Sequence, residues 1–147
     1  MIKLAIVGSR TFTDEKLFNE LMAHCDEKYI GGLLEVISGG AKGVDSLAVK
    51  WANEHNLPTK VFNAEWDNLE AVPCAVRTNK QGYKYNALAG HNRNAKIIQA
   101  CNCILAIWDG ESKGTLDSIK KAKELGKLGT VYNFKTGKEY ELKDLEI

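Results

Sequence analysis

The chain has 147 residues, a formal net charge of +1, 44% hydrophobic residues and 27% charged residues. This composition is typical of one globular domain and excludes a disordered, collagen-like or coiled-coil protein. No apolar run reaches the ~18–20 residues that span a membrane, so we expect no membrane partner. Residues 1–9 run straight into a strand-like segment without a signal-peptide pattern, which favours a cytoplasmic protein.

Apolar runs alternate with helical patterns in the first part of the chain. They predict a strand over residues 3–7, a helix over 14–29 capped by Thr13 and ended by Gly31-Gly32, a strand over 34–37, a helix over 43–55 and a strand over 59–62. Residues 63–89 show no clean period and contain Pro73 and Gly82. We interpret them as a long excursion from a single domain over residues 1–147, because structureless segments of this length are uncommon and often functional.

The alternation resumes after the excursion. We expect a helix over 90–100, a strand over 103–108, a helix over 114–125 closed by Gly126, a strand over 129–133, and a short edge strand over 138–142 after a turn at Thr136-Gly137. This order predicts an α/β fold: a Rossmann-like, mainly parallel sheet of about five strands, with helices on both faces and an extra C-terminal edge strand. Ligands of such sheets bind outside the carboxyl ends of the strands, so the residues there are the candidates for function.

The cysteines and histidines show no metal-ligand spacing. We therefore expect no structural metal and no cofactor. The cysteines, Cys25, Cys74, Cys101 and Cys103, are expected to be buried free thiols in a reducing compartment.

Two glycine-bearing loops follow the first two predicted strands. They read Gly8-Ser9-Arg10 and Ser38-Gly39-Gly40-Ala41-Lys42-Gly43-Val44-Asp45. Their N–H groups, the Ser9 hydroxyl and Arg10 suit a phosphate, and Asp45 suits a ribose hydroxyl or a helix cap. The second loop has neither the Walker A nor the dinucleotide-fingerprint spacing. Tight turns and close packing alone would also use these glycines.

A third loop follows the predicted strand over 103–108. It reads Asp109-Gly110-Glu111-Ser112-Lys113-Gly114-Thr115 and opens a helix. Gly114 and Thr115 suit a second anion contact, and Asp109 and Glu111 suit sugar hydroxyls. Alternatively, Ser112 or Thr115 only caps the helix and the acidic residues are solvated.

The helix after the excursion carries Arg93-Asn94 near its start. A single arginine there is by default a solvated surface residue. Because the three glycine-bearing loops open on one edge of the predicted sheet, we expect a pocket there for a nucleotide or phosphosugar.

The chain resembles the SLOG superfamily in the order and sequence of its motifs. These are the three glycine-bearing loops together with Ala64-x-Trp66-Asp67 and Ala89-Gly90-His91-Asn92-Arg93-Asn94. That name joins the DNA-processing proteins SMF/DprA with the Lonely Guy phosphoribohydrolases, and this chain is most similar to the small YspA-like SLOG proteins of bacteria and phages. The resemblance covers about residues 2–133. It implies a Rossmann-like sheet and a nucleotide pocket, often used to sense ligands. The pocket residues carried over are Gly8, Ser9, Arg10, Gly39, Gly40, Gly43, Asp45, Arg93, Gly114 and Thr115.

The chain departs from the Lonely Guy enzymes at one position. These enzymes cut an N-glycosidic bond with an arginine, which Arg93 matches, and with a glutamate whose position here is Ser118. A serine cannot act as that carboxylate, and Asp117 lies about 100° away around the helix. A hydrolase would need a different carboxylate, and we consider Asp45, Asp109 and Glu111.

The first hypothesis is therefore a protein that senses or sequesters a nucleotide-like small molecule, with residues 63–89 as a lid. The second is a nucleotide or nucleoside N-glycoside hydrolase. The third is a single-stranded DNA-binding accessory protein, in which aromatic residues stack bases beside a basic groove of Lys42, Arg77, Lys80, Lys84, Arg93 and Lys113. The aromatic residues are Trp66, Tyr83 and Tyr85, which could instead pack the excursion onto the domain. We also expect self-association into a homo-oligomer.

Overall fold

A computed structural model describes residues 2–28 and 33–147 of the chain. The first half contains β1 (Ile2–Gly8), α1 (Glu15–Lys28), β2 (Leu33–Ser38), α2 (Val44–Glu54) and β3 (Thr59–Val61). The second half contains β4 (Val76–Thr78), β5 (Lys84–Asn86), α3 (Ala89–Ala100), β6 (Cys103–Trp108), α4 (Lys113–Glu124), β7 (Leu128–Asn133), β8 (Lys138–Glu141) and a 3-10 turn (Leu142–Asp144).

Six strands form one sheet in the order β3-β2-β1-β6-β7-β8. The pairs among the first five strands are parallel, and β8 runs antiparallel to β7 at the edge. The expected α/β fold, with its mainly parallel Rossmann-like sheet and extra C-terminal edge strand, is therefore confirmed. The chain leaves the adjacent strands β1 and β6 in opposite directions across the sheet, and such a switch point opens a crevice at the carboxyl edge.

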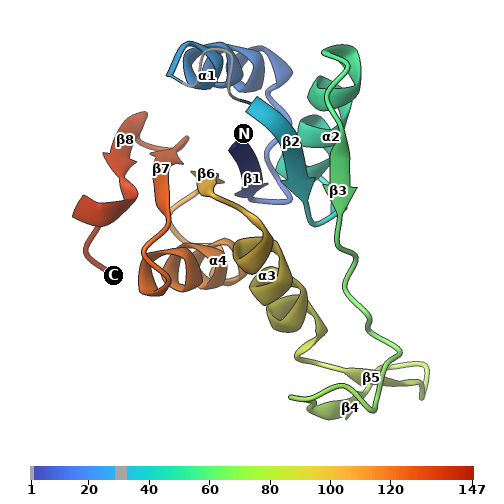
Figure 1. The fold of residues 1–147 in the computed structure, drawn as a ribbon. Helices are drawn as coiled ribbons and strands as arrows, with labels where there is room; N and C mark the ends of the chain where they lie inside the picture. Colours follow the sequence, from blue (N-terminus) through green and yellow to red (C-terminus); the bar gives the residue numbers. More distant parts are fainter. Residues whose placement is uncertain (1, 29–32) are drawn as a thin grey trace.

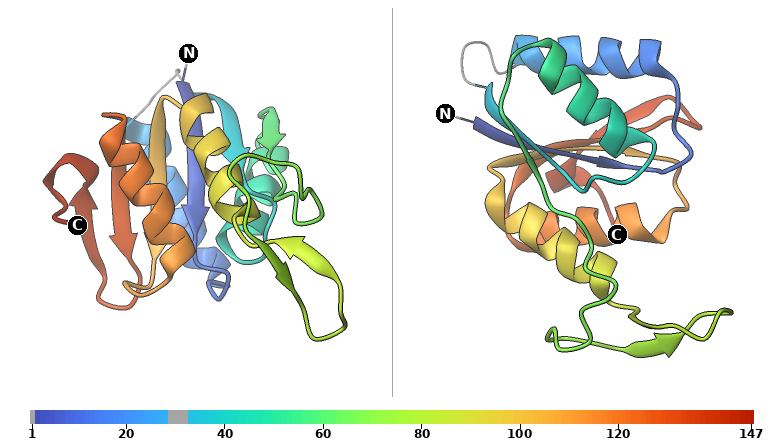
Figure 2. Two further views of the ribbon diagram at one scale, coloured as in Figure 1. Left: turned by 90° about the horizontal axis from the view of Figure 1, so that it is seen from below. Right: turned by 90° about the vertical axis from the view of Figure 1, so that its right-hand side faces the viewer.

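Helices cover both faces of this sheet, with α1 and α2 on one face and α3 and α4 on the other (Figure 2). Side chains of β1 alternate between the two layers: Leu4 and Ile6 pack in the α1/α2 core, and Ala5 and Val7 in the α3/α4 core. Because the central strands are buried on both faces, their sequences are continuous apolar runs rather than alternating ones.

The start of α1 differs from the expectation. Oδ1 of Asp14 accepts a 3.0 Å hydrogen bond from the N–H of Leu17, so Asp14 is the N-cap. The prediction of Thr13 as the cap was wrong by one residue; both residue types serve as N-caps, and pattern alone does not separate neighbours. The expected helix end at residue 29 and the Gly31-Gly32 stop lie outside the described residues.

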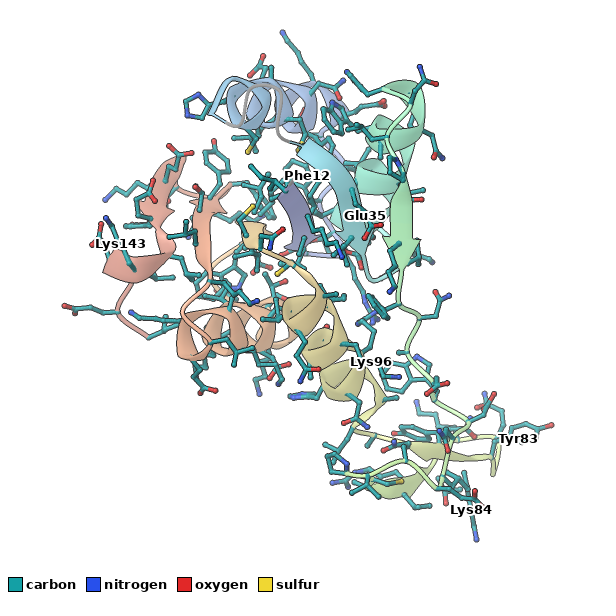
Figure 3. The ribbon with its side chains drawn as sticks, viewed as in Figure 1. Phe12, Glu35, Tyr83, Lys84, Lys96 and Lys143 are labelled. Atoms are coloured by element: carbon teal, nitrogen blue, oxygen red, sulfur yellow. The ribbon has the colours of Figure 1, made fainter. Side chains whose placement is uncertain are left out.

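The excursion between β3 and α3 contains an antiparallel hairpin, β4–β5, that the sequence pattern did not predict. Its strands have three residues each, too short to show a period. The hairpin projects away from the main sheet (Figure 1). Tyr83 and Lys84 extend from it (Figure 3), and Tyr83 is 72% exposed.

The structure also bears on two expectations from the composition, one about membrane-spanning helices and one about the cysteines. None of the helices in the described ranges is long and apolar enough to cross a bilayer. Three of the cysteines, Cys25, Cys101 and Cys103, are buried, whereas Cys74 is half-buried. Burial raises the pKa of Cys101 to about 11, so its thiol is protonated at neutral pH and is a core group rather than a nucleophile.

Candidate functional site

A cavity of about 360 Å³ lies at the carboxyl ends of β1 and β6. We call it the edge cavity. Ten of the residues expected at the site line it: Gly8, Ser9, Arg10, Asp45, Arg93, Asn94, Asp109, Ser112, Gly114 and Thr115. Val7, Thr11, Ala41, Ile97 and Ser118 complete the wall. Three separate loops and the start of α3 therefore meet at one place, as expected.

Three other expected residues, Gly39, Gly40 and Lys42, line an adjoining cavity of about 580 Å³. Ser38, Gly43, Gly110 and Glu111 line neither cavity. No residue from the 63–89 excursion lines the edge cavity, while Asn63, Ala64 and Trp66 line the adjoining one. The excursion as described therefore forms no lid over the edge cavity.

The first loop is held by close backbone approach. A Cβ on Gly8 would collide with the backbone oxygen of Ile107 and the side chain of Val44, and a Cβ on Gly43 would collide with the backbone oxygens of Ser9 and Arg10. The N–H of Ser9 donates a 3.1 Å hydrogen bond to the oxygen of Ile107. Gly8 and Gly43 are thus needed for the close packing that holds Ser9 at the cavity.

Ser9 is 2% exposed, and its Oγ has no hydrogen-bond partner among the described residues. A buried hydroxyl without a partner costs about 1–3 kcal/mol relative to a paired one. Because Ser9 lines the edge cavity, a polar group placed there would supply the missing partner.

The second loop is ordered by its own side chains. Oγ of Ser38 donates to the oxygen of Asp45 at 3.1 Å and accepts from the N–H of Gly40 at 3.3 Å. Oδ2 of Asp45 accepts from the N–H of Ala41 at 3.2 Å. Ser38 therefore shapes the loop, and its role as a ligand-binding residue stays a prediction.

Arg93 is half-buried, and two of its guanidinium nitrogens are hydrogen-bonded within the protein. Its Nη1 donates to the oxygen of Gly39 at 2.7 Å, and its Nε donates to Oδ1 of Asn94 at 2.9 Å. Nδ2 of Asn94 in turn donates to Oδ2 of Asp117 at 3.0 Å. The default interpretation of a solvated surface arginine is wrong, because α3 starts against the loop after β2 and encloses the guanidinium.

The third loop is held together by hydrogen bonds to the side chain of Asp109. Its Oδ1 accepts hydrogen bonds from the N–H groups of Ser112 and Glu111 at 2.7 and 2.9 Å. Ser112 is the N-cap of α4, yet its side chain makes no capping hydrogen bond and lies 3.4 Å from Oγ1 of Thr115. The alternative of a simple cap by Ser112 is thus not met. The N-terminus of α4, at Gly114 and Thr115, faces the cavity with its dipole unblocked by a cap.

Burial and charge set the protonation of the site. Burial raises the pKa of Asp45 above its ordinary value, although the Ala41 N–H and the charges of Arg93 and Arg10 act to lower it. Burial also lowers the pKa of Arg93, which Asp45 partly offsets, and an arginine nevertheless stays charged at neutral pH. Partial burial acts to raise the pKa of Asp109, but the hydrogen bonds from Ser112 and Glu111 outweigh it and lower the pKa.

The position that matches the Lonely Guy glutamate lies in the cavity wall. Ser118 is 2% exposed and lines the cavity. Asp117 does not line it and is held by Asn94 and Lys121. Of the acidic candidates, Asp45 and Asp109 line the cavity, and Glu111 is exposed outside it.

Sheet order and loop placement define this protein as a Rossmann-like α/β fold with a cavity at the carboxyl edge of its sheet. Residues 2–68 match the family described as YspA, cpYpsA-related SLOG family, which confirms the SLOG resemblance over those residues. The match contains the first two glycine-bearing loops and Trp66. No curated protein matches the chain significantly.

Two solved structures of DNA processing protein A, from two different bacteria, share the fold of this chain. The protein from Streptococcus pneumoniae has a TM-score of 0.62 and 20% identity, with 88% of this chain and 49% of that chain covered. The protein from Helicobacter pylori, described with a single-stranded DNA binding mode, has a TM-score of 0.59 and 22% identity, with 89% of this chain and 65% of that chain covered. This chain thus spans about half to two thirds of their length.

Proposed function

We propose that the protein binds a nucleotide or nucleotide-derived small molecule in the edge cavity and acts as a sensor or sequestering module. The observation that carries the proposal is the buried hydroxyl of Ser9, a residue of the cavity wall, which has no hydrogen-bond partner among the described residues. Around it the wall presents Arg10, Arg93 and the uncapped N-terminus of α4, which together favour an anion. The volume of about 360 Å³ lies within the usual range for small-ligand pockets.

The wall also suggests how the ligand is oriented. A phosphate suits the N–H groups of Gly114 and Thr115 at the start of α4. Ribose hydroxyls suit the carboxylates of Asp45 and Asp109, which are acceptors when ionised. The raised pKa of Asp45 in a cavity is also what a general acid or base requires. Turnover of the ligand at Asp45 is therefore the alternative that the experiment must exclude.

A thermal-shift series of mono-, di- and cyclic nucleotides, ADP-ribose and NAD tests the proposal. A ligand at 100 times its Kd stabilises the fold by about 2.7 kcal/mol. We expect at least one stabilising ligand that chromatography recovers intact. A ligand that is consumed by the wild type but not by Asp45→Asn would show a hydrolase instead. The absence of any stabilising ligand would contradict the proposal. Sedimentation at micromolar concentration tests the homo-oligomer that we propose with it.

A second candidate function, single-stranded DNA binding, is favoured by one charge pattern. Residues 71–108 contain five basic residues and no aspartate or glutamate: Arg77, Lys80, Lys84, Arg93 and Lys96. The first three lie in the projecting hairpin segment beside the exposed Tyr83. Stacking on an aromatic ring together with nearby cations is how many proteins hold single strands. Binding of an oligonucleotide that weakens steeply with salt and is lost on Tyr83→Ala would support it.

A further inference from the structure

A second cavity, also of about 360 Å³, lies between α3 and the segment that follows β3. We call it the amide cavity. Five carboxamide side chains line it: Asn63, Asn68, Asn86, Asn92 and Gln99. Arg93 belongs to the walls of both this cavity and the edge cavity. A wall with five carboxamides differs in character from the wall of the edge cavity, which carries the charged residues Arg10, Arg93, Asp45 and Asp109.

Asn86 has an unsatisfied donor in this wall. The residue is 0% exposed, and its Oδ1 accepts hydrogen bonds from the N–H of Ala75 at 3.1 Å and of Leu88 at 3.0 Å. Two N–H donors fix the oxygen on that side, so the amide cannot be flipped. Its Nδ2 is left without a partner among the described residues. Such a buried donor calls for an acceptor, and the described part of the chain provides none.

Contacts at several points hold the cavity open. Nδ2 of Asn92 donates to the oxygen of Pro73 at 2.9 Å, and Nζ of Lys96 lies 3.7 Å from Oε2 of Glu65. The N–H of Asn86 donates to the oxygen of Trp66 at 2.7 Å. These contacts pin the segment after β3 along α3, as the course of the chain in Figure 2 shows. The space between them is therefore formed before any ligand arrives.

We propose that the amide cavity binds the base of a nucleotide whose anionic part occupies the edge cavity. A carboxamide presents a donor and an acceptor in one plane, which matches the paired donors and acceptors on the edge of a nucleobase. Contacts within the protein use one end of Asn68, Asn86 and Asn92, so Asn63 and Gln99 would supply such a pair. Arg93, shared by both walls, would then lie between base and phosphate. This inference rests on the proposed function, because it assigns the second part of the same ligand.

Calorimetric titrations with ribose 5-phosphate, the four nucleoside monophosphates and the four nucleosides test it. The main variant is Gln99→Leu, since Gln99 is exposed on α3 and its replacement leaves the core intact. Asn86→Asp keeps the oxygen that Ala75 and Leu88 need and removes the Nδ2 donor. Asn53→Leu, at an exposed carboxamide in the last turn of α2, is the matched control.

We expect one nucleoside monophosphate to bind about tenfold more weakly to Gln99→Leu, as the loss of one hydrogen bond predicts. Ribose 5-phosphate should bind both proteins equally, and Asn53→Leu should behave as the wild type. Provided that its melting curve shows a folded protein, Asn86→Asp should bind the same monophosphate about as weakly as Gln99→Leu does.

Monophosphate affinities within twofold of the wild type for Gln99→Leu would overturn the inference and leave the proposed function standing. A nucleoside that binds without competing with the monophosphate would also overturn it. Failure of ribose 5-phosphate and all monophosphates to bind would overturn both.

Discussion

Arg93 Nη1 donates a 2.7 Å hydrogen bond to the backbone oxygen of Gly39, 54 residues earlier in the chain. This bond joins the first turns of α3 to the loop after β2. The same guanidinium lies in the walls of three cavities. Arg93 therefore joins α3 to the loop after β2, and in the proposed function it is also the cation that meets the anionic part of the ligand.

Replacing Arg93 should affect stability and binding together. Arg93→Ala removes the hydrogen bonds to Gly39 and Asn94, so we expect a loss of about 1–3 kcal/mol in the free energy of unfolding. Nucleotide affinity should fall about tenfold or more. Arg93→Lys keeps the positive charge but lacks the planar guanidinium, so its stability and its nucleotide affinity should lie between those of the wild type and Arg93→Ala. Urea unfolding and calorimetry measure both effects. Arg77→Ala, at an exposed arginine outside the cavity wall, is the control, and equal losses of affinity in both variants would argue against a direct role for Arg93.

Ser9→Ala should separate folding from binding. The variant removes a buried hydroxyl that has no partner among the described residues, so the unliganded protein should be as stable as the wild type or more stable. Nucleotide affinity should drop about three- to tenfold, because the ligand loses one hydrogen bond. Thermal melting with and without ligand measures both, with the exposed Thr13→Ala as control. A destabilised protein with unchanged affinity would show that the hydroxyl serves the fold.

Asp45 should make stability depend on pH. Burial raises the pKa of Asp45 in the folded protein, so the folded state keeps the proton to a higher pH than the unfolded state does. The resulting stabilisation is present below about pH 4, the ordinary carboxyl value, and is lost as the pH rises through the raised pKa. Asp45→Asn should therefore gain stability relative to the wild type between pH 4 and pH 7. Unfolding curves at both values test this, with Asp67→Asn as an exposed control. A difference in the free energy of unfolding between Asp45→Asn and the wild type that is the same at pH 4 and pH 7 would contradict this prediction.

The N-terminus of α1 offers a prediction about the fold alone. Asp14→Ala removes the hydrogen bond from the N–H of Leu17 and should cost about 0.5–2 kcal/mol. Thr13→Ala should change the free energy of unfolding by less than about 0.5 kcal/mol. Chemical denaturation of the two variants compares them directly. The reverse order of effects would restore Thr13 as the cap.

The sheet could be predicted because its strands are apolar runs separated by helical periods. The predicted strand over 103–108 has the observed bounds, because Cys103 to Ile107 form an apolar run that is buried between two helical layers. The β4–β5 hairpin could not be predicted, because three-residue strands carry no period and their pairing depends on the turn at Asn79. Oδ1 of Asn79 accepts from the N–H of Tyr83 at 2.9 Å, a local contact that composition alone does not reveal.

The site could be located from its loops but not resolved residue by residue. Glycines mark the loops, yet Gly8 and Gly43 are there because backbones approach closely, and sequence does not separate that reason from ligand contact. Thr11 and Ala41 carried no signal, because neither side chain is specific to a site. The unpaired amide of Asn86 appears only once Ala75 and Leu88 are placed around it.

Backbone amide chemical shifts during titration with the nucleotide that stabilises the protein most would test the central claim directly. We predict that the largest chemical-shift changes occur at the amides of Ser9, Ala41 and Thr115, because these residues line the edge cavity. The amides of β1 away from this edge should not move. Changes confined to the hairpin over 76–86, or no saturable changes at millimolar nucleotide, would contradict a nucleotide site at the carboxyl edge of the sheet.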